Sequence, residues 1–123
     1  MPQKPLFILV AGPYRSGTGN DPAKMEANLR QLEAAALPLF RAGHIPMIGE
    51  WVALPLAARA GARDVSDPLN EEFLYPTAQR LLQHCQAVLR LPGASQGADE
   101  DVRLARARGL PVYHDLSEVP GIA

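Results

Sequence analysis

Short apolar runs alternate with helical patterns along the chain, and this alternation constrains the fold more than any other feature. Residues 6–12, LFILVAG, form an apolar run ending in glycine, which predicts a strand buried on both faces. Further strands are expected at residues 44–50, 87–93 and 111–116. Between the first two strands, apolar residues recur at helical spacing: Met25, Leu29, Leu32, Ala36 and Leu39. Strands alternating with helices predict a parallel sheet joined by right-handed crossovers.

The length of 123 residues fits a single domain spanning residues 1–123. We expect an α/β fold, a three-layer α/β/α sandwich. Its parallel sheet should have four to five strands in flavodoxin-like order. Ligands of such sheets bind beyond the carboxyl ends of the strands, so the loops after the first and third strands are the candidate site.

The helices have recognisable boundaries in three places. Asp21 followed by Pro22 predicts a helix start that Gly43 ends, with Pro38 bending the helix or ending its regular part. Residues 51–68 have no clear pattern and could form a short helix and loop covering a pocket. Residues 69–85 are expected to be helical, interrupted or restarted at Pro76. The helix after the third strand should stop at Gly109.

Charge and cysteine content limit the partners and the compartment. The formal net charge is -1, which gives no reason to expect nucleic acid or an anionic membrane as partner. The apolar N-terminal run is too short for a secretory signal. Cys85 is the only cysteine, fits a cytoplasmic protein and is expected to be a buried structural thiol. The three histidines have no ligand-like spacing, so no metal site is predicted.

The loop after the first strand, AGPYRSGTG, combines glycines with polar side chains. Gly12 would let a ligand approach the backbone, while Tyr14, Arg15 and Ser16 offer hydrogen bonds suited to a sugar or phosphate. A mobile surface loop is an equally good interpretation. The spacing matches neither a Walker loop nor a dinucleotide-binding loop. Glu50, at the end of the second predicted strand, could bind a ligand hydroxyl or be an ordinary surface acid.

The turn after the third strand, LPGASQGADED, leads into a helix through three acids. Ser95 and Gly97 lie where free N–H groups favour an anion, although Ser95 also suits a helix N-cap. At about 100° per residue, Asp101 lies within the apolar arc of the helix. Glu100 lies at its edge and Asp99 faces solvent, near the arginines of the next turns. An inward acid is costly unless paired or used, so Asp101 is the first candidate catalytic residue and Glu100 the second.

Three segments together resemble the nucleoside 2-deoxyribosyltransferase-like superfamily. They are FILVAGPYRSG, the following helix and strand ending at Glu50, and RLPGASQGADEDVRLARARGLPVY. The chain is most similar to small, mostly uncharacterised members that share the AGPY start and the LPG-x-S-x-G turn. The similarity extends to deoxyribonucleoside 5′-monophosphate N-glycosidases.

The resemblance implies a compact parallel-sheet enzyme, often a homodimer or larger homo-oligomer, that cleaves the bond between base and sugar without a cofactor. A carboxylate attacks the anomeric carbon, and water or a second base resolves the covalent intermediate. The family nucleophile lies six residues after the serine, which places it at Asp101. Ser95 and Gly97 would lie near a 5′-phosphate or sugar hydroxyl. The opposite wall would be formed by Gly12, Tyr14, Arg15 and Ser16.

The sequence departs from the family pattern at two points. Asp101 replaces the usual, longer glutamate, and Glu100 could take its role if the helix start shifts. The acid usual in the helix before the third strand is absent, although Glu71 or Glu72 could substitute. The alternative function is therefore a non-catalytic nucleotide or sugar-phosphate binding or sensor domain. A cytokinin-activating phosphoribohydrolase ranks lower, because the run P-G-G-x-G-T-x-x-E is missing.

Overall fold

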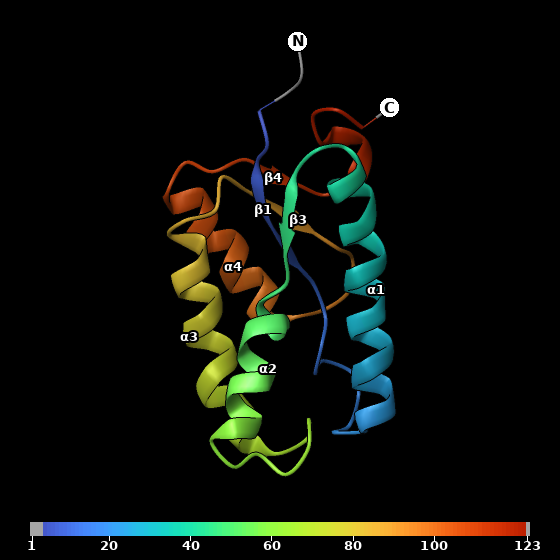
Figure 1. The fold of residues 1–123 in the computed structure, drawn as a ribbon, viewed down its shortest axis with the longest axis vertical. Coiled ribbons are helices and arrows are strands. Elements are labelled where there is room, and N and C mark those ends of the chain that lie inside the picture. Colours follow the sequence, from blue (N-terminus) through green and yellow to red (C-terminus); the bar gives the residue numbers. More distant parts are fainter. Residues whose placement is uncertain (1–3, 123) are drawn as a thin grey trace.

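Four parallel strands form one sheet with helices on both faces (Figure 1). The computed structural model describes residues 4–122. The strands are β1 (Phe7–Ala11), β2 (Ile45–Met47), β3 (Ala87–Arg90) and β4 (Val112–Tyr113), in the order β2-β1-β3-β4. The helices are α1 (Pro22–Arg41), α2 (Gly49–Arg59), α3 (Glu71–Leu82) and α4 (Gln96–Ala107), with short 3-10 turns η1 (Pro68–Asn70) and η2 (Leu116–Glu118). The predicted three-layer α/β/α sandwich with a parallel sheet is confirmed.

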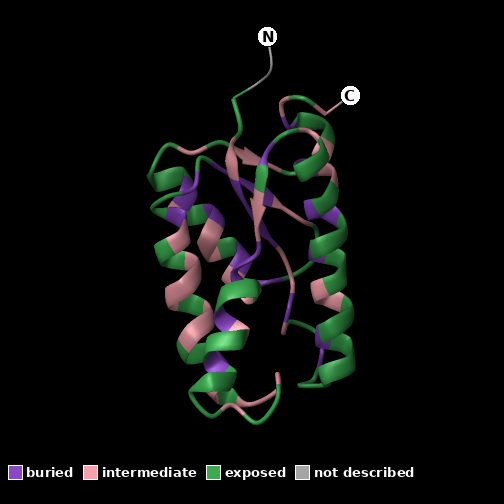
Figure 2. Ribbon diagram, in the orientation of Figure 1, coloured by how far each residue is buried: buried purple, intermediate pink, exposed green. Residues whose placement is uncertain are grey.

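The central strand β1 divides the apolar core into two layers. Ile8 and Val10 face the layer covered by α1, whereas Leu9 and Ala11 face the layer covered by α3 and α4. Burial therefore follows the period of two that a strand covered on both sides requires, and the buried residues concentrate along the sheet and the inner helix faces (Figure 2). Cys85 is buried in the second layer, as predicted.

Two helix starts follow the capping rules that the sequence indicated. The Asp21 carboxylate accepts a hydrogen bond from the N–H of Ala23, and Pro22 is the first helical residue of α1. The Ser95 hydroxyl accepts from the N–H of Ala98 and caps α4. Both helices are followed within two residues by a glycine of positive φ, Gly43 after α1 and Gly109 after α4.

Prolines interrupt the helices less than predicted. Helix α3 continues through Pro76, so the expected break or restart there is wrong, and α1 continues through Pro38 to Arg41. A helix-interior proline removes one backbone hydrogen bond, but the contacts of α3 with α2 and α4 hold the chain helical. The unassigned residues 51–68 contain most of α2, which includes Pro55, followed by a loop and the start of η1.

The second and fourth strands are shorter than predicted. Strand β2 ends at Met47, and Gly49 already belongs to α2, so Glu50 lies in the first turn of a helix rather than at a strand end. β2 is an edge strand, and Pro46 has no N–H to extend its pairing. Within residues 4–122, no helix is both long and apolar enough to cross a membrane.

Candidate functional site

A cavity of about 100 Å³ lies beyond the carboxyl ends of β1 and β3, next to the start of α2. It is lined by Leu9, Val10, Ala11, Gly12, Tyr14, Arg15, Ser16, Gly49, Glu50, Leu74, Tyr75, Ala78, Ser95, Gly97, Ala98 and Asp101. The structure thus brings together every site residue predicted from the sequence except Glu100. In Figure 1, α2 and the loop that follows it extend past this end of the sheet, at the bottom of the view.

The two candidate catalytic acids of α4 lie in different environments. Asp101 is partly buried and lines the cavity. Glu100 lies outside the cavity, its side chain is 43% exposed, and its carboxylate accepts a hydrogen bond of 2.8 Å from Nε of Arg103. Asp99 is exposed as predicted, but it pairs with Arg90 rather than with an arginine of its own helix. Of the two candidates, only Asp101 is placed to meet a ligand in the cavity.

The electrostatics separate the same two acids. Burial, followed by the nearby charges of Glu50 and Glu100, raises the pKa of Asp101 to about 7, although Arg90 acts in the opposite direction. The hydrogen bond from Arg103 lowers the pKa of Glu100. Because α4 begins at Gln96, Asp101 lies in its second turn, beyond the region where the helix dipole stabilises a carboxylate. Asp101 is therefore the acid that changes its protonation near neutral pH.

Glu50 brings a second carboxyl group to the cavity, from helix α2. It belongs to the first turn of α2, and its burial raises its pKa. The negative charge of Glu50 in turn raises the pKa of Asp101. Such a pair favours a state in which one carboxyl group keeps its proton near neutral pH.

The loop after β1 supplies a phenol and a guanidinium group. Tyr14 is buried, and its burial together with the charge of Glu50 raises its pKa to about 12, so the hydroxyl stays protonated. Nη2 of Arg15 donates to Oδ1 of Asn20 at 3.1 Å and to the carbonyl of Ser66 at 3.4 Å. The buried Nη1 atom has no hydrogen-bond partner within residues 4–122. One arm of the guanidinium is held by hydrogen bonds, while the other makes only an ion pair of 3.7 Å with Glu71.

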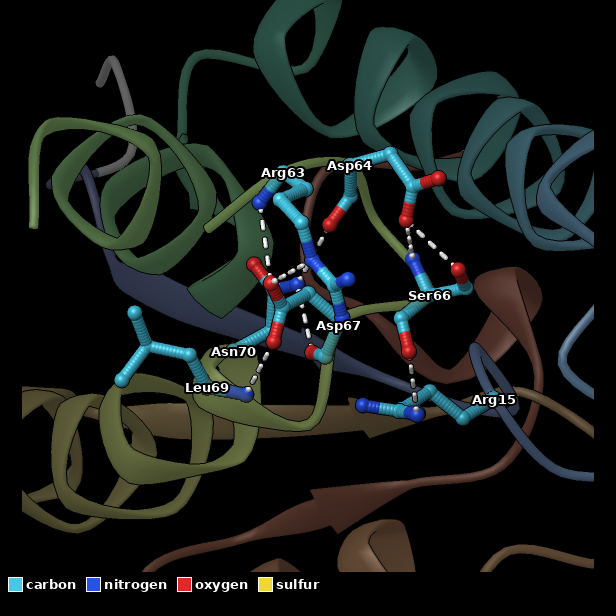
Figure 3. A network of polar contacts seen from close by, with 7 residues as sticks. All are labelled: Arg15, Arg63, Asp64, Ser66, Asp67, Leu69 and Asn70. Atoms are coloured by element: carbon cyan, nitrogen blue, oxygen red, sulfur yellow. Dashed lines mark hydrogen bonds and ion pairs between the residues drawn. The ribbon is translucent and has the colours of Figure 1, made fainter. Parts of the chain in front are cut away.

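The carbonyl of Ser66 belongs to a loop held together by its own polar contacts (Figure 3). The carboxylate of Asp67 accepts from the backbone N–H groups of Arg63 and Leu69, and the carboxylate of Asp64 accepts from the N–H of Ser66. The buried amide of Asn70 donates to the carbonyls of Asp64 and Asp67. This bracing gives Arg15 a fixed acceptor at the edge of the cavity.

The turn after β3 is fixed by Arg90 and by two close packing contacts. Nη1 of Arg90 donates to the carbonyl of Leu91, and Nη2 donates to the carbonyl of Gly93 at 3.0 Å. Gly93 has a φ of +113°, and a Cβ there would lie 2.7 Å from Cγ of Pro13. A Cβ on Gly12 would lie 3.1 Å from Cβ of Leu91. The two loops around the cavity therefore need glycine at position 93, and a side chain at position 12 would have to displace its neighbours slightly.

Sequence reasoning missed the wall that α3 contributes. Leu74, Tyr75 and Ala78 line the cavity, and their spacing of four residues from 74 to 78 could have indicated one helix face had Pro76 not suggested a break. Neither Glu71 nor Glu72 lines the cavity. The acid that could have substituted for the missing family carboxylate is thus not supplied by α3.

No group of three or more His, Cys, Asp or Glu side chains within residues 4–122 is arranged to hold a metal ion. Compared with models of known protein families and with curated proteins, the chain matches none.

Proposed function

We propose that this protein is an N-glycosidase or glycosyl transferase that cleaves the base–sugar bond of a nucleoside or nucleotide-like substrate, with Asp101 as the nucleophile. The observation that carries the proposal is the Asp101 carboxyl group, partly buried on the cavity wall with a pKa of about 7. A titratable acid desolvated in a cleft is typical of a catalytic group. The similarity of the sequence to the nucleoside 2-deoxyribosyltransferase-like superfamily supports the same residue.

The reaction follows the logic of a retaining glycosidase. The ionised carboxylate of Asp101 attacks the anomeric carbon and forms an ester to the sugar, while the bond to the base breaks and its electron pair leaves with the base. Water, or a second base in a transfer reaction, then attacks the same carbon and releases Asp101. The negative charge of Asp101 also stabilises the positive charge that the sugar develops in each transition state.

Glu50 and Tyr14 serve as proton-carrying partners in this proposal. In this proposal Glu50, whose pKa is raised by burial, gives a proton to the departing base, and the resulting carboxylate can later take a proton from the attacking water. Tyr14, whose pKa is about 12, remains a hydrogen-bond donor to a sugar or phosphate oxygen.

Two features of the cavity favour a substrate that carries a phosphate. One is Nη1 of Arg15, which has no hydrogen-bond partner within the described residues, and the other is the start of α4 at Ser95 and Gly97, with its free backbone N–H groups. A guanidinium and a helix N-terminus facing one cavity form a site suited to an anion. The apolar wall of Leu74, Tyr75 and Ala78 is then left for the base.

The alternative function is a domain that binds a nucleotide or sugar phosphate without cleaving it. The observation that favours it is the α3 wall, whose cavity residues Leu74, Tyr75 and Ala78 include no carboxylate to orient the sugar or the leaving base. The shorter side chain of Asp101 favours the same alternative.

A nucleotide panel distinguishes the two functions. We expect incubation with ribo- and deoxyribonucleosides and their 5′-monophosphates to release free base, detected by chromatography, from at least one substrate. Thermal shift is measured on the same panel. Ligands that raise the melting temperature, with no base released from any member of the panel, would refute the enzyme and support the binding domain.

The proposal includes a homodimer in the cytoplasm. Large apolar side chains are exposed on α2 at Trp51, Val52 and Leu56, and Tyr75 of the cavity lining is also exposed. Several exposed apolar side chains on one helix support an interface with a second copy. The single, buried Cys85 fits a reducing compartment.

A further inference from the structure

Arg15 forms an ion pair with a glutamate carboxylate at the edge of the cavity. Nη1 of Arg15 lies 3.7 Å from Oε1 of Glu71, in the first turn of α3. That distance is short enough for charge attraction but too long for a hydrogen bond. The Arg15 side chain is 20% exposed, whereas that of Glu71 is 52% exposed. The carboxylate is therefore a loose counter-ion, free to move into solvent.

The position of Arg15 does not depend on this counter-ion. Its other arm is held by Asn20 and by the carbonyl of Ser66, in the loop braced by Asp64, Asp67 and Asn70 (Figure 3). Removing the charge of Glu71 would leave those hydrogen bonds in place. The guanidinium is thus fixed on one side, while the atom facing Glu71 is the one without a hydrogen bond.

We propose that Glu71 competes with the substrate's phosphate for Arg15 and thereby sets the affinity of the site for anions. This inference rests on the anion-binding role of Arg15 in the proposed function. When a phosphate enters, its oxygens take Nη1 and the Glu71 side chain moves to solvent. The contact weakens binding of any free anion, so a substrate must gain the rest of its affinity from its sugar and base. Glu71 is a specificity-determining residue in this sense.

The sign of a charge-neutralising variant separates competition from support. If Glu71 competes, Glu71→Gln tightens anion binding, because Arg15 then presents its full charge to the cavity. If Glu71 instead holds Arg15 in position, the same variant weakens binding. An ion pair with one exposed member contributes up to about 1 kcal/mol, which corresponds to a change in affinity of about two- to fivefold.

The experiment measures the dissociation constant of inorganic phosphate for the full chain by calorimetry or thermal shift. We expect Glu71→Gln to bind phosphate about two- to fivefold more tightly than the wild type, with the gain lost at high salt. Glu72→Gln is the matched control, because Glu72 shares the first turn of α3 but does not pair with Arg15. It should leave the affinity unchanged.

The outcomes separate this inference from the proposed function. Unchanged or weaker phosphate binding by Glu71→Gln, or an equal gain in Glu72→Gln, would overturn the competition even if base release is observed. Equal phosphate binding by the wild type and Arg15→Gln would overturn the anion-binding role of Arg15, and the competition with it. Activity gives a second measure: for a phosphorylated substrate, Glu71→Gln should lower KM and leave kcat unchanged.

Discussion

The two ends of the sheet differ in how well their polar groups are satisfied. At the amino ends of the strands, His44 accepts a hydrogen bond from the N–H of Leu6 at Nδ1, and its Nε2 lies 2.6 Å from the carbonyl of Pro120. Oε1 of Gln86 accepts from the N–H of Phe7. At the carboxyl ends, Asp101 and Glu50 have raised pKa values and Nη1 of Arg15 has no hydrogen-bond partner within the described residues.

This difference indicates that the polar groups at the amino ends of the strands stabilise the fold, whereas those at the carboxyl ends interact with a ligand. Buried polar groups in folded proteins are generally paired, so side chains left without partners need a separate explanation. A ligand that supplies the missing partners is such an explanation, and the cavity lies at that end. Substitutions at the amino ends should therefore change stability and spare activity. Substitutions at the carboxyl ends should lower activity without destabilising the fold.

The largest expected effect comes from Asp101→Asn. The amide keeps the shape of the side chain but cannot attack the anomeric carbon, so base release should fall at least about a thousandfold. The measurement is single-turnover release of base from the best substrate of the nucleotide panel, with the melting temperature as a check on folding. Glu100→Gln is the matched control and should stay within about threefold, because Glu100 lies outside the cavity. If Glu100→Gln lost more activity than Asp101→Asn, Glu100 rather than Asp101 would be the nucleophile.

The same pair of residues shows what the sequence could predict. Helical geometry alone placed Asp101 on the inward arc, because a period of 3.6 residues determines which face a position occupies once the helix is known. The strand β1 and the caps Asp21 and Ser95 were predictable for a similar reason, since each depends on a few neighbouring residues.

Features that depend on tertiary contacts were not predictable. The cost of Pro76 inside α3 is offset by packing against α2 and α4, which no local pattern reveals. The contact between Arg15 and Glu71 joins residues far apart in the chain, and the position of Glu50 in the first turn of α2, rather than at a strand end, followed from the early end of β2. Local rules thus found the helix that carries Asp101, whereas the groups facing it came from the arrangement of the elements.

The second largest effect is expected at the amino ends of the strands, where the polar groups are hydrogen-bonded. In His44, Nδ1 accepts a hydrogen bond and therefore carries no proton, so Nε2 is the donor to Pro120. His44→Ala would leave two partly buried backbone groups unpaired and remove a buried ring, at a cost of about 3 kcal/mol in the free energy of unfolding and about 10 °C in Tm. Base release per folded molecule should stay unchanged. The exposed His114→Ala is the control, and an equal loss there would refute the role of His44.

The smallest expected effect concerns how much the partly buried Asp101 carboxylate at the carboxyl ends of the strands destabilises the fold. The folded state raises the pKa of Asp101 to about 7, above the value of about 3.9 expected when unfolded. As pH rises, Asp101 therefore loses its proton in the unfolded state before it does so in the folded state. The free energy of unfolding falls as pH rises from about 4 to about 7. Asp101→Asn removes the charge, so it should raise Tm by about 3 °C or more at pH 8 and have little effect near pH 4. Glu100→Gln should lower Tm at pH 8, because the folded state lowers the pKa of Glu100 and its charge therefore stabilises the protein at neutral pH. Thermal melts of both variants at the two pH values test this contrast, and a stabilising Glu100→Gln or a destabilising Asp101→Asn at pH 8 would contradict it. Opposite signs from adjacent acids would show that burial at the cavity, rather than the helix itself, determines the behaviour of Asp101.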